Sequence, residues 1–182
     1  GFSTLNFAQE FLFGPLGISD VEWEQDPQGL YLGGHGLYLR PRDMAKFGYL
    51  YLHNGMWDDE QIIPAVWVDK STETLILRGE YGYGYQWWTD PSHEIYFASG
   101  LYGQKIIVVP DYDIVIVFTA TIKRGSNPEF ELLFDFIIPA VIGDTNITLV
   151  EFDNLSLSVV IAFVVSYVLV VPAVLIVKKR RF

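Results

Sequence analysis

The chain has 182 residues, enough for one ordinary domain with a sizeable core. Apolar residues make up 51% of it and aromatic residues 16%, a composition too rich for a disordered protein. The formal net charge of −10 argues against binding of nucleic acid, which needs a basic face. There is no cysteine, so disulfides and thiolate metal sites are excluded.

The first part of the chain predicts a helix followed by a glycine-rich loop. Apolar residues recur at helical spacing from Leu5 to Leu12, Ser3 or Thr4 can cap the helix, and Gly14-Pro15 ends it. Residues 18–39 contain several glycines and predict a loop region. The chain has no initiator Met and no signal peptide, and it opens in what looks like the middle of a domain.

Three further helices are predicted. One covers residues 40–54, with Pro41 in its first turn and Gly55 as its stop, and a shorter one covers 64–71. A third covers 128–138, capped by Asn127. The side chains expected to be buried are those of the apolar stripes of these helices: Met44, Phe47, Leu50, Tyr51, Val66, Trp67, Leu132, Leu133, Phe136 and Ile137.

Residues 81–121 predict an antiparallel meander. Aromatic residues alternate with Gly and Gln from Tyr81 to Trp87, which indicates a strand. Three more strands are expected at 95–97, 105–109 and 114–121, and the last two are joined by a turn that begins at Pro110. An antiparallel sheet covered by helices gives an α+β fold.

The C-terminal part of the chain predicts a membrane anchor. Leu155–Val177 carries no charge, and as a helix it would span about 34 Å, enough to cross a bilayer core. The basic run Lys178–Arg181 follows directly and indicates a cytoplasmic end. We therefore expect a domain over 1–142 outside the cell, a linker over 143–154, a single-pass helix in the cell membrane over 155–177 and a cytoplasmic tail over 178–182. Two sequons, at Asn146 and Asn154, agree weakly with this orientation.

The chain contains no complete catalytic set. No Ser is followed three residues later by Lys, and the Gly-x-Ser-x-Gly, His-Glu-x-x-His and P-loop motifs are absent. His35, His53 and His93 lie in different segments, and we expect structural or solvated roles for them. No metal and no cofactor is expected.

Several blocks, in order, resemble the class C β-lactamase and penicillin-binding-protein group of serine hydrolases, which includes 6-aminohexanoate-dimer hydrolases. They are residues 11–18, 36–48, Tyr81–Gly84, Ala98–Gln104 and Val109–Asp111. The resemblance covers roughly residues 1–142 and implies the C-terminal part of a β-lactamase/transpeptidase-like fold. The family's nucleophile motif Ser-x-x-Lys and its Tyr-x-Asn motif would lie upstream of Gly1, so neither can be assigned in this chain.

The resemblance aligns Ala98-Ser99-Gly100 with the family's third motif, usually Lys-Thr-Gly or His-x-Gly, at the edge of the active site. Ala98 departs from that pattern because it supplies no charge for a β-lactam carboxylate. The residue after the motif's glycine gives a backbone oxyanion donor in the family, and here that residue is Leu101. Ala98, Ser99, Gly100, Tyr102 and Gly103 would then contact substrate, with the aromatic strand 81–88 near the pocket wall. Judged by their spacing alone, Gly100 and Gly103 also fit a plain turn.

The expected function follows from this resemblance. We expect the C-terminal part of a membrane-anchored serine hydrolase acting on an amide or ester of a small molecule or peptide, inactive without the missing N-terminal part of its domain. The first alternative is a non-catalytic binding or scaffold module, and the second is a β-rich membrane anchor. The missing strands would normally pair with the strand at 114–121, so its edge should be bare.

Overall fold

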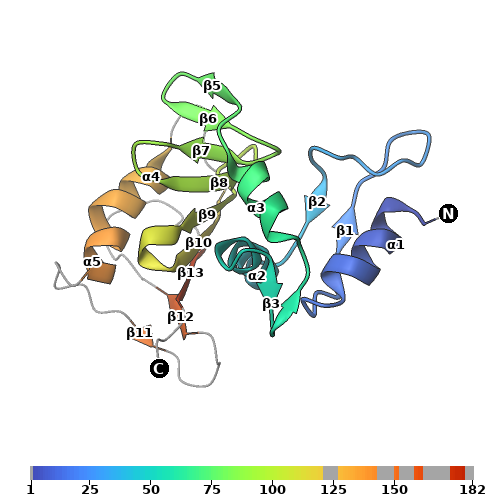
Figure 1. Ribbon diagram of the computed structural model, residues 1–182, viewed down its shortest axis with the longest axis horizontal. Coiled ribbons are helices and arrows are strands. Elements are labelled where there is room, and N and C mark those ends of the chain that lie inside the picture. Colours follow the sequence, from blue (N-terminus) through green and yellow to red (C-terminus); the bar gives the residue numbers. More distant parts are fainter. Residues whose placement is uncertain (1, 121–126, 143–149, 152–157, 162–172, 179–182) are drawn as a thin grey trace.

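One antiparallel sheet with helices on both faces makes up most of the molecule (Figure 1). The computed structural model describes residues 2–120, 127–142, 150–151, 158–161 and 173–178. Nine strands pair in the order β11-β12-β13-β10-β9-β8-β7-β6-β5. Helix α2 (Pro41–Leu52) covers one face, and α4 (Pro128–Leu132) with the π-helical segment η3 (Leu133–Ile137) covers the other. The predicted α+β class is confirmed.

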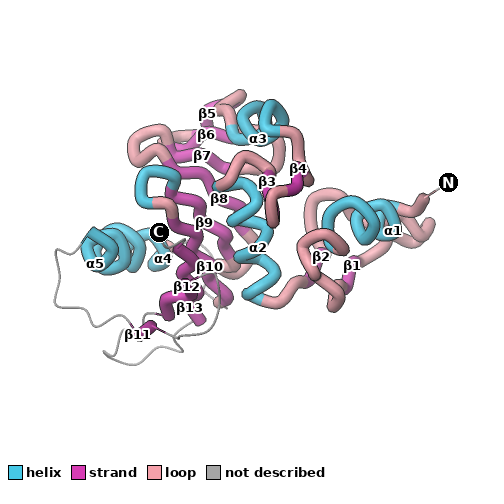
Figure 2. The backbone as a smooth tube through the Cα atoms, turned by 60° about the horizontal axis from the view of Figure 1, so that its bottom comes forward, coloured by secondary structure: helices cyan, strands magenta, loops and turns pink. Residues whose placement is uncertain are grey.

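The meander forms one side of the sheet, from the inner strand β10 to the edge strand β5, and its strands lie side by side in chain order (Figure 2). Its last strand is buried on both faces, as an uninterrupted apolar run predicts, because all five residues from Ile114 to Phe118 are fully buried. The six strands are β5 (Ile76–Arg78), β6 (Tyr81–Tyr83), β7 (Trp88–Asp90), β8 (Ile95–Ser99), β9 (Lys105–Val109) and β10 (Ile114–Thr119).

The predicted strand over Tyr81–Trp87 is wrong in its length. The strand β6 stops at Tyr83, and the chain turns through Gln86, whose φ of +67° no strand residue adopts. Trp88 then begins β7, which runs back against β6. The alternating pattern therefore spans a tight hairpin and not one straight strand, and β5 and β7 were not predicted.

The outer edge of β10 is paired, contrary to the prediction of a bare edge. Strand β13 (Ala173–Lys178) lies antiparallel to β10 along its whole length, and β12 (Ser158–Ile161) and β11 (Val150–Glu151) follow it. An unpaired edge exposes backbone N–H and C=O groups, so an apolar run rich in β-branched residues can satisfy them by adding a strand.

The helix predicted over Leu155–Val177 does not appear in the described part of that range, which consists of β12 and most of β13. The rest of it, together with residues 143–149, 152–157 and 179–182, lies outside the described residues. Among the described residues, no helix has the length and apolar character needed to cross a bilayer.

On the first face of the sheet, α2 packs very close to the strands. Gly48 lies where a Cβ atom would come within 2.5 Å of Val115 Cγ1 and 2.7 Å of Ile106 Cγ2. Tyr51 and Trp87 complete this layer, with ring centroids 4.6 Å apart. Helix α2 matches the predicted range, and its predicted stripe is confirmed because Leu50 and Tyr51 are buried and Met44 and Phe47 are partly buried.

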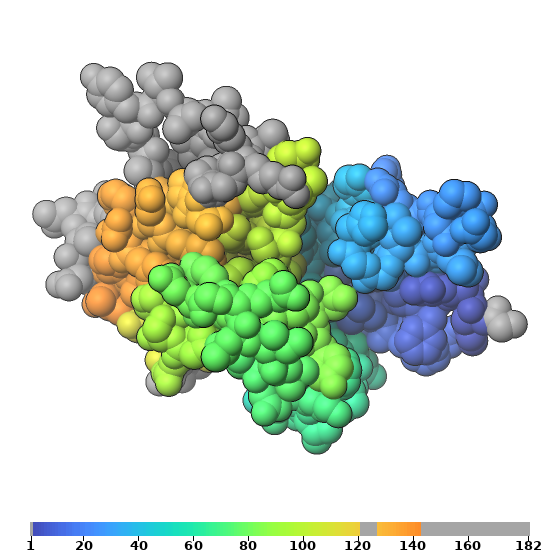
Figure 3. All heavy atoms as spheres, turned by 90° about the horizontal axis from the view of Figure 1, so that it is seen from above, coloured from blue at the N-terminus to red at the C-terminus, as the bar shows by residue number. Residues whose placement is uncertain are grey.

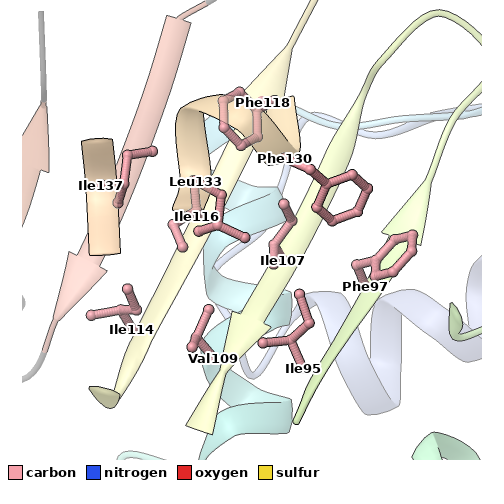
Figure 4. Packing of buried hydrophobic residues seen from close by; sticks show 10 residues of the cluster. All are labelled: Ile95, Phe97, Ile107, Val109, Ile114, Ile116, Phe118, Phe130, Leu133 and Ile137. Carbon is pink, nitrogen blue, oxygen red and sulfur yellow. The ribbon is translucent and has the colours of Figure 1, made fainter. Parts of the chain in front are cut away.

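On the second face, the helical segment after β10 packs on a wholly apolar cluster. Phe130 and Leu133 lie over Phe97, Ile107 and Ile116, as Figure 4 shows. The helix continues as predicted and extends through α5 (Ile138–Ile142). Asn127 occupies the predicted N-cap position of α4, but its side chain makes no capping hydrogen bond. Phe136 is 40% exposed, so its predicted burial is wrong.

Helix α3 (Ala65–Thr72) forms where it was predicted but faces the other way. Val66 is 74% exposed and Trp67 is 41% exposed, whereas Val68 and Ser71 are buried. The position of the apolar residues within so short a helix is not enough to fix its buried face, because only one turn contacts the core.

The N-terminal residues form a separate layer beside the sheet (blue in Figure 3). It consists of α1 (Thr4–Ala8), the π-helical segment η1 (Gln9–Phe13), and the strand pair β1 (Glu22–Trp23) and β2 (Leu37–Tyr38). Ser3 caps α1 as predicted, since its side chain accepts a hydrogen bond from the Asn6 N–H. Leu50 of α2 joins this layer's core, and the short hairpin β3 (Met56–Trp57) and β4 (Glu60–Gln61) follows α2.

Candidate active site

The candidate site lies at the end of β8, which projects past its neighbour β7. Strand β7 begins at Trp88, opposite Phe97, whereas β8 continues to Ser99. On its other side β8 stays paired, and Ser99 lies opposite Lys105 of β9. β8 is therefore paired with β9 as far as Ser99, whereas Ala98 and Ser99 extend past the last pair with β7. This arrangement lets another group approach the backbone.

The loop 100–104 is braced by the side chain of Gln104. Its Oε1 accepts a hydrogen bond from the Tyr102 N–H at 3.1 Å, and its Nε2 donates to the Ala120 carbonyl at 3.1 Å. The Gly100 N–H donates to the Gln104 carbonyl at 2.7 Å. A Cβ at Gly100 would lie 2.9 Å from Gln104 Oε1 and so would displace the bracing side chain, and Gly103 has φ +91°, a conformation that favours glycine.

Within this braced loop, the Leu101 N–H has no partner among the described residues. The N–H groups of Gly100, Tyr102 and Gly103 each donate to a group of the loop itself. For Leu101 no such bond occurs within the part of the chain that the structure describes. Leu101 is 60% exposed, so its side chain is not packed into the core. A free N–H on a fixed loop is the kind of donor that an oxyanion needs.

The two side chains before the loop point to opposite faces of the sheet. Ala98 packs against the cluster under α2, whereas Ser99 shares its face with Ile95 and Phe97 under α4. Ser99 is exposed, and Tyr102 is 49% exposed. The six predicted site residues, Ala98, Ser99, Gly100, Leu101, Tyr102 and Gly103, therefore lie together around one strand end.

A buried ion pair lies directly behind Ser99. Lys105 Nζ is 3.3 Å from Glu129 Oε1, and the two side chains are only 4% and 1% exposed. The same ammonium donates to Ser99 Oγ at 3.4 Å and sits 5.5 Å from the centre of the Phe130 ring. Neither Glu129 oxygen has a well-aligned hydrogen bond among the described residues.

The aromatic residues of 81–88 mostly belong to the core. Trp87 is 3% exposed and stacks in the layer under α2, and Tyr81 packs edge-on against Phe97 and face-on against Phe130. Tyr85, at 43% exposure, is open and touches Trp67. Burial is the first reason that the pKa of Tyr81 is raised, with the Asp90 and Glu80 charges adding to it.

The histidines lie apart, as predicted. His35 is exposed in its loop, and His53 is the C-terminal cap residue of α2 with its ring 4.0 Å from that of Tyr49. His93 contacts Asp90 Oδ2 at 2.8 Å. Burial alone would raise the Asp90 pKa, but bonds from Ser92 and His93 and the His93 charge hold it below its ordinary value. In the described part of the chain, no three His, Cys, Asp or Glu residues gather as metal ligands would.

The antiparallel sheet has helices on both faces and carries a glycine-containing loop at the end of its inner strand β8, which fits the predicted β-lactamase-like fold. Residues 7–139 match the family model described as Beta-lactamase, which is more than half of the chain. The chain belongs to the beta-lactamase family. The predicted resemblance is thereby confirmed at the level of the family.

A solved structure named "Putative 6-aminohexanoate-dimer hydrolase from Bacillus anthracis" is similar in fold, with a TM-score of 0.66 and 24% sequence identity. The alignment covers 79% of this chain and 39% of that chain, so this chain spans well under half of that relative. At this identity the likeness concerns the fold alone. No match was found among the curated proteins.

Sequence reasoning missed three residues around the strand end: Gln104, Lys105 and Glu129. One signal was present for Lys105, because a lysine opens a strand that is otherwise Ile-Ile-Val-Val. Glu129 fits the first turn of a helix and gave no sign of burial. Its partner lies far away in sequence, so only the fold brings the two charges together.

Proposed function

We propose that the chain is the C-terminal part of a membrane-anchored serine hydrolase that cleaves an amide or ester through an acyl-serine intermediate. The nucleophilic serine, its lysine and the tyrosine base would come from the upstream part of the same domain. The serine Oγ would attack the substrate carbonyl, and the tetrahedral oxyanion would collapse to expel the amine or alcohol. Water would then release the acyl group.

The observation that carries this proposal is the Leu101 N–H, which donates to no group among the described residues and lies on a braced loop. Acyl transfer needs donors fixed in place before the oxyanion forms, because a donor that must first move into position stabilises the oxyanion less. The Gln104 side chain fixes the loop from two directions, and β8 continues past its last pair with β7. The second donor would be the N–H of the upstream serine.

Ala98 supports an amidase or esterase over a β-lactamase. A methyl side chain offers neither charge nor hydrogen bond to a β-lactam carboxylate, and here it packs partly into the apolar layer under α2. The substrate would thus be a small molecule or peptide held mainly through its carbonyl groups. The chain alone would be inactive, because it lacks a Ser-x-x-Lys set.

We also propose that Leu155–Val177 anchors the full-length protein in the cell membrane, with the main domain outside and Lys178–Arg181 in the cytoplasm. The uncharged run and the basic cluster after it support this orientation. Upstream strands of a complete domain would take the edge of β10, which would release the segment of β13 for the bilayer.

Active-site labelling of membranes that contain the full-length protein tests this function. We expect a fluorescent fluorophosphonate to label the protein, a fluorescent penicillin to leave it unlabelled, and the labelled band to stay in the pellet after a carbonate wash. Labelling by penicillin would contradict the inference from Ala98 that the site does not recognise a β-lactam. Release of the band into the supernatant would contradict the anchor.

The second candidate is a non-catalytic binding or scaffold module with the same fold. Loss of the Ser-x-x-Lys and Tyr-x-Asn motifs from the upstream part of the domain would favour it. A folded full-length protein that neither probe labels would support it over the hydrolase.

A further inference from the structure

The buried pair Lys105–Glu129 is poorly explained by stability alone. Both side chains are almost completely removed from water. The desolvation of two charges offsets most of their attraction, so a well-packed apolar pair is often as stable or more so. The rest of β9 and its helical cover are apolar, and an apolar pair would suit this place.

The third member of the cluster is Ser99, which the family resemblance places in contact with substrate. Lys105 Nζ lies 3.4 Å from Ser99 Oγ, and an ammonium carries donors only. The Ser99 oxygen must therefore accept from Lys105, and its own hydrogen is left for another acceptor. Ser99 is exposed, so that hydrogen can point outward from the strand end.

Glu129 holds the ammonium in this position. Lys105 has a flexible stem, but its head is held by the carboxylate at 3.3 Å on one side and the Phe130 ring at 5.5 Å on another. The backbone register, with Ser99 directly opposite Lys105, fixes the distance between their side chains. The hydroxyl is thus oriented by a charge that substrate cannot reach.

We propose that Lys105 and Glu129 are positioning residues that act through Ser99 and make its hydroxyl a fixed hydrogen-bond donor to a second carbonyl oxygen of the substrate, beyond the scissile one. This rests on the proposed acyl-transfer function. It also names the substrate class: acyl groups that carry an amide or similar carbonyl near the bond that is cleaved. The Ser99 hydroxyl would bind such a carbonyl through a hydrogen bond from the face of the sheet opposite to Ala98.

Two activated esters of equal acyl length test the proposal on the full-length protein. The acyl group of p-nitrophenyl N-acetylglycinate has a second carbonyl, and that of p-nitrophenyl pentanoate has none. The measured quantity is the ratio of kcat/KM for the first ester over the second. We expect wild type to prefer the first, and Ser99→Ala to lower the ratio about three- to tenfold, as the loss of one hydrogen bond does.

The double variant Lys105→Met/Glu129→Leu should lower the ratio as much as Ser99→Ala does. Adding Ser99→Ala to it should lower the ratio no further, because the pair acts through Ser99. Lys105→Arg keeps a donor beside Glu129, so its ratio should lie between those of wild type and the double variant. Ile107→Val lies two residues along the same strand face and should leave the ratio unchanged.

The outcomes separate the inference from the proposed function. If fluorophosphonate fails to label wild type, the hydrolase function falls and the inference falls with it. If wild type labels but prefers neither ester, or if Ser99→Ala keeps the full ratio, the inference alone is overturned. A double variant that labels normally with an unchanged ratio would show that the pair is only structural.

Discussion

The two faces of the central sheet are built differently. Toward α2, the strands present Ile106, Val108, Val115 and Val117 to a helix that Gly48 brings into close contact. Toward α4, the layer is equally apolar along most of its length but ends in the buried charges of Lys105 and Glu129, beside the candidate site. The first face is explained by packing alone, whereas the second places charge where the proposed chemistry would use it.

The largest expected effect comes from removing one charge of the buried Lys105–Glu129 pair on the second face. Lys105→Met alone leaves the Glu129 carboxylate buried without its counter-charge, which should cost about 3–5 kcal/mol of unfolding free energy. The double variant Lys105→Met/Glu129→Leu should recover most of this loss. Urea unfolding of the full-length protein, followed by tryptophan fluorescence, measures both.

A double variant as unstable as the single one would contradict this reading. It would mean that the ion pair itself, and not the orphaned charge, carries the stability. Ile107→Val is the matched apolar control on the same strand face and should cost about 1 kcal/mol.

A smaller effect is expected from filling the close contact on the first face. The new methyl of Gly48→Ala would meet Val115 and Ile106 at well under van der Waals distance, so α2 must shift. We expect a loss of about 1–3 kcal/mol, even though alanine favours a helix more than glycine does. Gly34→Ala is the control, because no atom lies within 4 Å of its added Cβ, and it should change stability by less than about 0.5 kcal/mol. Equal stabilities of the two variants would show that α2 is not closely packed.

The sequence was sufficient for the elements that one local pattern defines. The run from Ile114 to Phe118 predicts a strand buried on both faces, and Pro41 and Gly55 place the ends of a helix within a few residues. The pattern from Tyr81 to Trp87 failed, because alternation cannot reveal that Gln86 turns the chain back. Long-range pairing was also out of reach, as the strand β13 against β10 shows.

Only some residues of the candidate site could be assigned from the sequence. Ala98 to Gly103 were assigned through a family resemblance, and the fold places them together at one strand end. The bracing by Gln104, and the Leu101 N–H that donates to no described residue, depend on atom positions that sequence spacing does not reveal. The pair Lys105–Glu129 requires two distant segments to meet in the core, so its members looked like ordinary charged residues.

The most direct test of the central claim is the rate of fluorophosphonate labelling of the full-length protein with two substitutions at one position. Leu101→Ala keeps the backbone N–H and should label at close to the wild-type rate. Leu101→Pro removes that N–H and should label about 10²–10³-fold more slowly, the effect of losing one oxyanion donor. Equal rates for the two variants, with both proteins folded, would contradict the claim that Leu101 donates to the oxyanion.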